Sequence, residues 1–330
     1  MRRAGSPAQP GRRNHDGVAS LLTRAAQSSA GAYLLVDPFL ATWRQARDRL
    51  RIPVSNDVTV VKVGYAGITD DHCPHLIRWK STDDTWLRHS MMLADEEQAD
   101  GGQESVKGLM ISGWLFSDEA PATIAHHLAR ISTLRHPKAG RCYLRWADRR
   151  VLEWMWPSFS SCQRRRLLGP INAWYTLNRR GGLIEYQTPK EEREPEEHFL
   201  SPLTVEQWRR AEQGQLVQTL LRGWAGGNTE ALPEDYLLQA GNAIQGALTL
   251  GLSRQRDVLL LAGYTLQVHP RLAEHPSVIE VVQRSRKTGV PLQAALQEIE
   301  DPSGWERIRK ELSEHAPRQG AAIDRRESAT

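Results

Sequence analysis

Three polar residues near the middle of this 330-residue chain have the types that acid–base chemistry uses: His127, Arg145 and Asp148. A histidine exchanges protons near neutral pH, an arginine holds an anion, and a carboxylate can orient a histidine. They would form an enzyme centre only if the fold brought all three together. The alternative is structural, because an arginine–carboxylate pair can pin a strand end to the following helix. We favour the structural interpretation and expect no catalytic residue, since His127 also lies on the apolar face of its predicted helix.

Other motifs for catalysis or metal binding are missing from the sequence. Ser112 and Gly113 are followed by Trp114, so no G-x-S-x-G turn forms around a nucleophile. The three cysteines form neither a C-x-x-C pair nor a metal-binding spacing with histidines, which is typical of ordinary thiols in a reducing compartment. His126 and His127 are adjacent and point about 100° apart on a helix, which does not suit one shared ion. We therefore expect a protein that is not an enzyme and that holds no metal and no cofactor.

Residues 130–180 carry twelve basic and two acidic residues, although residues 31–330 as a whole balance at 38 of each. Four tryptophans are interleaved with this charge: Trp146, Trp154, Trp156 and Trp174. Basic side chains among stacking aromatics can bind single-stranded nucleic acid. If the tryptophans instead belong to the core, the arginines only coat a surface. We keep nucleic-acid binding by residues 130–180 as the alternative function and regard nucleic acid as the less favoured partner.

Strands and helices are interleaved in the first half of the chain, and these elements must position the polar residues. Apolar runs and period-2 alternation predict strands, and apolar residues at helical spacing predict helices. The predicted strands are 32–36, 58–64, 75–79, 108–112, 142–146 and 182–186, and the predicted helices run through 43–50, 118–134 and 160–168. Ser160 and Gln163 have the spacing of a capping box for the last of these helices. Residues 31–187 are therefore predicted to form a mixed α/β (α+β) lobe.

Composition and helix signals predict the remaining segments. Residues 1–30 are rich in Arg, Ala, Ser and Gly, which predicts a disordered basic tail with one helical turn at 21–27. The acidic residues 94–107 predict an exposed loop, and the three prolines and five glutamates of 188–202 predict a linker. Residues 203–313 carry helix starts and stops and are predicted to form an all-α C-terminal lobe, followed by a second disordered tail at 314–330. The helix signals are Thr204 with Gln207, Pro276 and Gly289.

Hydrophobicity along the chain gives an expectation about location. No stretch of about 18 consecutive apolar residues is present, which a membrane helix requires. The arginines near the N-terminus are not followed by the apolar core of a signal peptide. We expect a cytoplasmic protein with no membrane partner.

Several short motifs occur in an order that resembles a known family. They are the strand Tyr33–Asp37, Cys73-Pro74 before a strand, the strand 108–112, His127-Leu128, the run Arg145–Leu152, and Gly169-Pro170 shortly before Trp174. Together they resemble the N-terminal lobe of the type VI secretion adaptor-chaperones, a family long catalogued as a domain of unknown function. The family usually has an aromatic residue before the motif aspartate and a proline after it, whereas this chain has Ala147 and Arg149.

The resemblance implies a non-enzymatic adaptor of bacteria. It would bind an effector encoded nearby, keep it soluble and deliver it to the valine–glycine repeat spike protein. The family motif implies structural or binding roles for Asp37, Pro74, His127, Arg145, Asp148, Gly169 and Pro170. The C-terminal lobe, which the resemblance implies is the more variable part, would choose the effector. There, aromatic anchors can hold a partner helix in a groove, and the candidate partner-binding residues are Trp208, Trp224, Tyr236 and Trp305.

Overall fold

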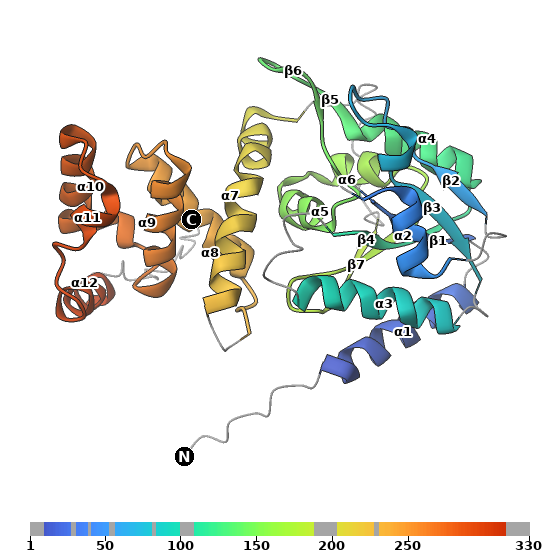
Figure 1. Ribbon diagram of the computed structural model, residues 1–330, viewed down its shortest axis with the longest axis horizontal. Coiled ribbons are helices and arrows are strands. Elements are labelled where there is room, and N and C mark those ends of the chain that lie inside the picture. Colours follow the sequence, from blue (N-terminus) through green and yellow to red (C-terminus); the bar gives the residue numbers. More distant parts are fainter. Residues whose placement is uncertain are drawn as a thin grey trace, which may run out of the picture. The chain divides into compact units, whose positions relative to one another are not determined.

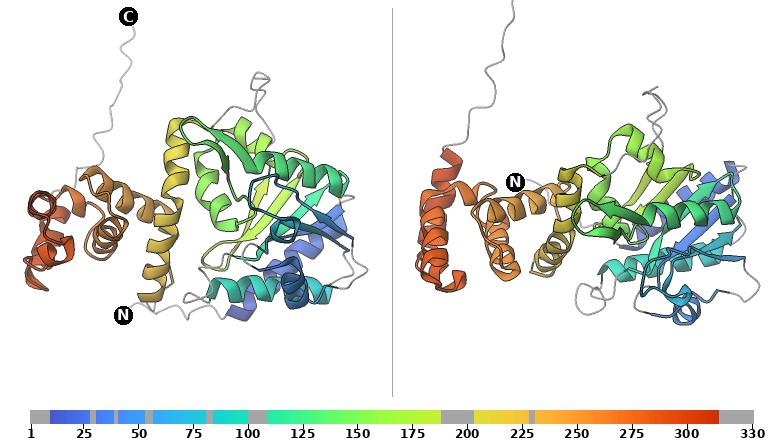
Figure 2. Two further views of the ribbon diagram at one scale, coloured as in Figure 1. Left: turned by 45° about the horizontal axis from the view of Figure 1, so that its top comes forward. Right: turned by 90° about the horizontal axis from the view of Figure 1, so that it is seen from above.

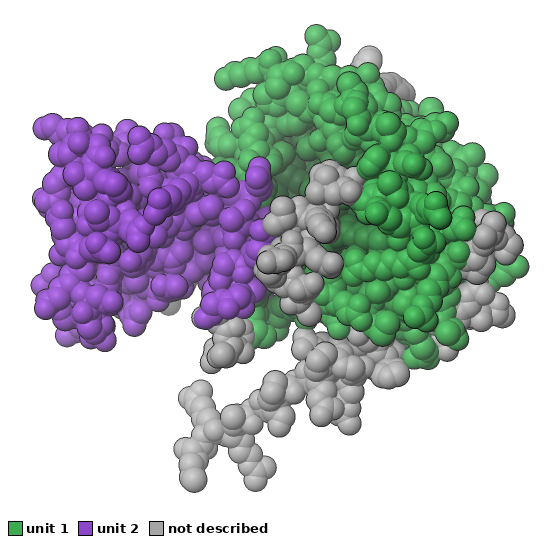
Figure 3. Space-filling model, in the orientation of Figure 1, with its two compact units in different colours: residues 1–214, 229–232 green, residues 215–228, 233–330 purple. Residues whose placement is uncertain are grey.

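The computed structural model describes residues 10–27, 31–38, 41–52, 57–80, 84–99, 109–187, 203–227 and 231–314. The chain divides into two compact units, coloured separately in Figure 3. The first comprises residues 1–214 with 229–232, and the second comprises residues 215–228 with 233–330. The division falls between Gly214 and Gln215, inside one helix. The first residues of the predicted C-terminal lobe, from 203 onward, therefore belong to the first unit.

A six-stranded antiparallel sheet forms the centre of the first unit, in the order β2-β3-β1-β4-β7-β8 (Figure 1). In the middle of the sheet, Leu34 pairs with Ile77 on one side and with Trp114 on the other. Every residue of β4 is buried, as expected of a strand whose two faces are both covered. The strands are β1 (Gly31–Val36), β2 (Val58–Val60), β3 (His75–Trp79), β4 (Ile111–Ser117), β7 (Ala173–Leu177) and β8 (Leu183–Gln187).

Helices cover both faces of this sheet, as Figures 1 and 2 show. α1 (Pro10–Gln27), α2 (Trp43–Leu50) and α3 (Asp84–Ala99) pack on the face that carries Leu34 and Val36. α4 (Pro121–Ser132), α5 (Arg149–Met155) and α6 (Ser161–Leu168) lie on the opposite face. The smaller elements are the 3-10 helices η1 (Asp70–His72) and η3 (Trp156–Ser158) and a separate hairpin of β5 (Thr133–His136) and β6 (Gly140–Tyr143). The predicted mixed α/β lobe is confirmed, as three layers.

All the regular elements in the described residues of the second unit are helices, which confirms the predicted all-α C-terminal region. Pro276 opens α10, and Gly289 ends it at a left-handed φ of 76°, where glycine meets no Cβ penalty. The helices are the second part of α7 (Val205–Gly227), then α8 (Tyr236–Thr249), α9 (Gln255–Gln267), η4 (Leu272–Glu274), α10 (Pro276–Thr288), α11 (Leu292–Leu296) and α12 (Ser303–Glu314).

Both capping boxes predicted from spacing are present. The backbone N–H of Gln163 donates to Ser160 Oγ over 3.2 Å, and the Gln163 side chain accepts from the Ser160 backbone N–H over 3.0 Å. The same exchange joins Thr204 and Gln207 over 3.2 and 2.9 Å. These contacts satisfy backbone donors at the starts of α6 and α7 that no helical carbonyl reaches.

The N-terminal segment differs from the predicted disordered tail. α1 is an 18-residue helix, and Val18 and Leu21 are buried in the core of the first unit. Leu22 and Ala25 pack against the same core. These four residues have the i, i+3, i+4, i+7 spacing of an amphipathic helix, and the arginine-rich composition conceals it. Residues 1–9 and 28–30 lie outside the described residues.

Other predicted boundaries are corrected as well. The predicted loop 94–107 begins inside α3, where Ala94 and Glu97 are buried, and residues 100–108 lie outside the described residues. The predicted strand 142–146 ends earlier, at Tyr143, and the predicted helix 118–134 ends at Ser132. β7 has no counterpart in the sequence prediction. The predicted linker 188–202 and residues 315–330 of the predicted C-terminal tail lie outside the described residues.

Candidate functional site

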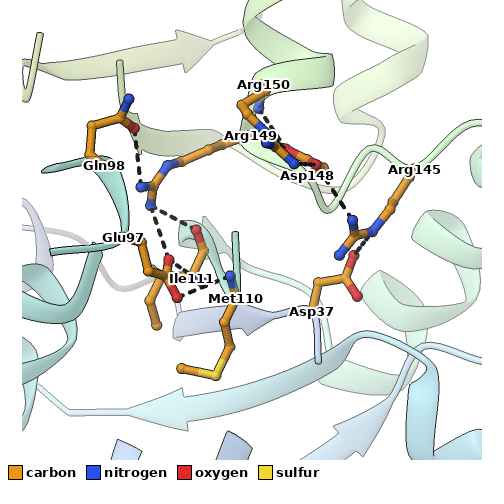
Figure 4. A network of polar contacts seen from close by, with 9 residues as sticks. All are labelled: Asp37, Glu97, Gln98, Met110, Ile111, Arg145, Asp148, Arg149 and Arg150. Atoms are coloured by element: carbon orange, nitrogen blue, oxygen red, sulfur yellow. Dashed lines mark hydrogen bonds and ion pairs between the residues drawn. The ribbon is translucent and has the colours of Figure 1, made fainter. Parts of the chain in front are cut away.

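Motif residues from distant parts of the first unit meet at the end of β1. Asp37 follows this strand and is only 2% exposed. Arg145 lies 108 positions later and donates from Nε to Asp37 Oδ2 over 2.6 Å. Its Nη1 also reaches Asp148 Oδ2 at 3.5 Å. Arg145 therefore joins two buried carboxylates, one from the end of β1 and one from the start of α5 (Figure 4).

Asp148 caps α5 and pairs with the residue two positions later. Its Oδ1 accepts from the backbone N–H of Arg150 over 3.0 Å. The Arg150 guanidinium donates to both carboxylate oxygens, from Nε over 2.9 Å and from Nη2 over 2.6 Å. Burial alone would raise the pKa of Asp148, but Arg150 and Arg145 hold that pKa below the usual aspartate range. The carboxylate is thus ionised at neutral pH and engaged by both arginines.

Arg149 points away from this carboxylate into the protein and is 2% exposed. Its guanidinium donates to the carbonyl oxygens of Ala94 over 2.6 Å and Ile111 over 2.9 Å. It also lies 3.9 Å from Glu97, whose carboxylate accepts backbone N–H groups of Met110 and Ile111 over 3.1 and 3.2 Å. Arg149 therefore ties the end of α3 to the start of β4 (Figure 4).

Sequence reasoning missed the role of Arg149 and Glu97. Arg149 stands in the sequence only as a departure from the family pattern, and Glu97 falls in the segment predicted as a loop. The spacing of Glu97 from Leu93 and Ala94 could have placed it on the buried face of a helix, because residues three and four positions apart share one face and both of these residues are buried. No local pattern identifies the partners of Arg149, because they come from α3 and β4.

A second group of motif residues surrounds the His127 ring. Its Nε2 lies 2.9 Å from the Leu167 carbonyl oxygen, and burial lowers the pKa of the imidazole. Gly169 packs against this ring at a φ of 54°, and a Cβ there would overlap the imidazole. The next carbonyl, of Pro170, accepts the hydroxyl of Ser117. His127, Gly169 and Pro170 thus hold the end of α6 against α4 and β4.

The last motif position is Pro74, directly before β3. Its carbonyl oxygen accepts the backbone N–H of Val61 over 2.8 Å, which extends the pairing beyond β2. Pro74 is buried and has a structural place at the sheet edge.

The three residues considered for acid–base chemistry do not share one contact network. Arg145 and Asp148 are joined, whereas His127 bonds the end of α6. The charged cluster holds three acids (Asp37, Glu97, Asp148) and three bases (Arg145, Arg149, Arg150), so its charges balance. This arrangement fixes strand and helix ends to one another. Among the described residues, no group of three or more His, Cys, Asp or Glu side chains is placed to hold a metal ion.

Three of the four candidate partner-binding aromatics are core residues. Trp208, Tyr236 and Trp305 are 5%, 3% and 8% exposed. Trp208 meets the His136 ring edge-on, and Trp305 stacks on Tyr264. Burial leaves these three side chains little surface for a partner. Trp224, on α7, is partly exposed and remains a candidate.

The tryptophans of the basic segment are mostly core residues as well. Trp146, Trp154 and Trp174 are buried, while Trp156 is partly exposed and lies beneath the Arg164 guanidinium at 5.3 Å. The indole N–H of Trp154 donates to the Arg210 carbonyl oxygen. Three of the basic residues, Arg145, Arg149 and Arg150, are engaged in the charged cluster. The segment therefore presents fewer stacking surfaces than its sequence indicates.

Comparisons with known proteins bear on the first unit. Residues 32–166 match the model of a family described as a domain of unknown function, DUF4123. The matched segment contains the charged cluster and His127, and it ends before Gly169 and Pro170. A search of curated proteins and a search of solved structures gave no match. Across the described residues, no helix combines the length and apolar character needed to cross a membrane.

Proposed function

We propose that this protein is a non-enzymatic adaptor-chaperone that binds a type VI secretion effector, keeps it soluble and loads it onto the spike protein. The proposal depends mainly on the agreement between the family match and the motifs found in the sequence. The domain match at residues 32–166 covers most of the motifs that resemble the adaptor-chaperone family. Within that segment Arg145 bonds both Asp148, three positions away, and Asp37, which lies 108 positions earlier in the sequence.

The chemistry of the charged cluster supports an architectural role for the motif. Its carboxylates and guanidinium groups form hydrogen bonds of 2.6 to 3.5 Å with one another or with the backbone, and Arg149 and Glu97 form an ion pair at 3.9 Å. Such a cluster stabilises the framework from which a surface is presented. An adaptor needs accessible surface more than a reactive group, because covering apolar client segments removes them from water and lowers aggregation.

Nucleic-acid binding by residues 130–180 is less well supported. Stacking of bases requires exposed aromatic faces, and three of the four tryptophans of residues 130–180 are buried. We therefore retain nucleic acid as an outcome of the test and not as a second proposal.

Co-expression with the products of the neighbouring genes tests the proposal. We expect one neighbour to co-purify with the tagged full-length protein and to move from the insoluble to the soluble fraction. Trp224→Ala should weaken capture of that neighbour, because Trp224 is the partly exposed aromatic candidate of the second unit. Trp156→Ala is the matched control, since it removes a partly exposed tryptophan from the first unit.

Two results would contradict the proposal. One is that no neighbouring product co-purifies or gains solubility. The other is that nucleic acid co-purifies instead and leaves at high salt, as expected when phosphate contacts release counterions.

A further inference from the structure

A hollow of about 440 Å³ lies in the helical unit between α8, the end of α9 and the segment around η4. Amide and hydroxyl side chains make up much of its wall: Gln239, Asn242, Gln245, Thr249 and Thr265. The apolar part is formed by small or aliphatic residues, and none of the described residues that line it is aromatic. Pockets for small-molecule ligands and cofactors are usually lined by hydrophobic and aromatic side chains. The lining indicates a ligand rich in hydrogen-bonding groups.

The polar residues of α8 form a stripe along one face of the helix. Gln239, Asn242, Gln245 and Thr249 follow one another at intervals of three or four residues, which places them on the same side. Over this stretch the helix rises about 15 Å. An extended chain rises about 3.3 Å per residue, so the stripe has the length of four or five residues of extended peptide.

Leu238 adds an apolar contact at one end of the stripe. It lies one turn before Asn242 on α8, and 62% of its surface is exposed. Among the large hydrophobic residues of the described chain, only Val205 is more exposed. A peptide along the stripe can therefore place an apolar side chain against Leu238 while its backbone faces the amides.

The charges of the lining cancel. Arg271 and Glu274 are its charged residues, and Arg271 Nε lies 3.0 Å from Glu274 Oε2. An anionic ligand would compete with Glu274 for the guanidinium, and a cationic ligand would compete with Arg271 for the carboxylate. The hollow therefore favours an uncharged ligand.

Carboxamide groups complement a peptide backbone, because each offers both a donor and an acceptor, as each backbone residue does. The Asn242 side chain is exposed and, within the described part of the chain, makes no hydrogen bond. Gln239 and Gln245 each donate one within α8 and its cap, to Asp235 and Thr249, and Gln239 keeps its carbonyl oxygen for a ligand. We infer that this hollow binds an extended, uncharged polypeptide segment through its backbone. The inference goes beyond the proposed function, since it concerns peptide recognition by the helical unit whatever the client is.

A displayed library of random 12-residue peptides, selected on the full-length protein, tests this inference without a known client. We expect selected peptides to contain a run of four or five uncharged residues. The double variant Asn242→Ala/Gln245→Ala should bind a selected peptide about tenfold more weakly, as the loss of two hydrogen bonds predicts. Both positions are exposed, so unchanged thermal unfolding should show that the variant is folded. Gln283→Ala, on the exposed side of α10, is the matched control and should bind like the wild type.

The inference is overturned if no peptide is selected, or if the double variant and the wild type bind the selected peptide equally. Binding of a glycan array in place of peptides, lost in the same variant, would also overturn it. These results are separate from the co-expression test. Capture of a neighbouring product by the wild type and the double variant alike would leave the adaptor proposal intact and place the client elsewhere.

Discussion

At the scale of single residues, the stability of the first unit depends on the buried guanidinium of Arg149. It donates to the carbonyl oxygens of Ala94 and Ile111 and pairs with Glu97 at 3.9 Å. Arg149→Met retains an unbranched side chain but removes every donor, which leaves Glu97 buried without its cation. Because breaking a buried ion pair costs about 3–5 kcal/mol, we expect the free energy of unfolding in urea to fall by that amount. Arg130→Met, at an exposed position of α4, should cost about 0.5 kcal/mol or less. Equal losses in the two variants would show that the Arg149 contacts do not stabilise the fold.

His75 makes stability depend on pH. Its ring is buried, stacks on Trp43 at 3.9 Å and bonds the Cys73 carbonyl oxygen through Nδ1. Burial lowers its pKa to about 4, whereas the pKa of histidine in an unfolded chain is about 6.5. Between these values the unfolded chain binds more protons, so stability rises with pH and is lost on acidification. The contribution of His75 to the free energy of unfolding should fall by about 2 kcal/mol from pH 7 to pH 5.

Urea unfolding at pH 7 and pH 5 measures this contribution. His75→Phe keeps an aromatic ring beside Trp43 and removes the titrating group. We expect the wild type to lose about 2 kcal/mol more than this variant between the two pH values. The same loss in both proteins would exclude the buried neutral imidazole as its cause.

Residue roles were predictable where a local pattern marks them. Arg145 and Asp148 lie three positions apart at a predicted strand end, and structural pairing was the favoured interpretation of them. Asp37, the other carboxylate that Arg145 binds, was known only from the family resemblance. The contacts of Arg149 were not predictable, since Ala94 and Ile111 are brought to it by the sheet and by α3. Long-range contacts of this kind have no sequence spacing to detect.

At the scale of elements, the junction between α6 and β7 requires a glycine. Gly169 has a φ of 54°, and its backbone lies against the His127 ring of α4. Gly169→Ala should cost both the backbone strain of a positive φ and the overlap of the new Cβ with the imidazole. Gly67→Ala is the matched control, because Gly67 has a φ of 87° with open space around it. We expect Gly169→Ala to lower the free energy of unfolding by about 2 kcal/mol more than Gly67→Ala. Similar losses at both positions would mean that His127 moves aside without cost.

Elements were predictable where their signals are short and local. The capping boxes at Ser160 and Thr204 each need only four residues, and both are present. α1 was missed because its composition is that of a flexible tail while its apolar spacing is that of a packed helix. Packing of Val18 and Leu21 in the core of the first unit outweighs the composition. β7 is short and buried on both faces, and five residues without alternation of apolar and polar side chains carry no periodicity that separates strand from helix.

At the scale of the whole molecule, a truncation that keeps the first unit intact must end at the boundary between the units and not at the start of α7. Residues up to Gly214 of this helix belong to the first unit. There, the Arg210 guanidinium lies 3.6 Å from the centre of the Trp154 ring, and Gln207 donates to the Ser158 carbonyl oxygen over 2.7 Å. A chain truncated at the predicted linker, residues 188–202, would lack these contacts, which stabilise the first unit.

Two truncated chains separate stability from client binding. A chain ending at Gly214 retains Trp208, Arg210 and Gln207, and we expect it to unfold cooperatively. A chain ending at Pro202 loses the burial of Trp208 and the bond between Trp154 and Arg210, which together should lower the free energy of unfolding by about 3 kcal/mol. If the helical unit selects the client, the stable chain ending at Gly214 should fail to capture the neighbouring product that full-length protein retains. Capture at full strength by the chain ending at Gly214 would place client recognition in the first unit. If capture is lost only in the chain ending at Pro202, client binding depends on the packing of α7 against Trp154.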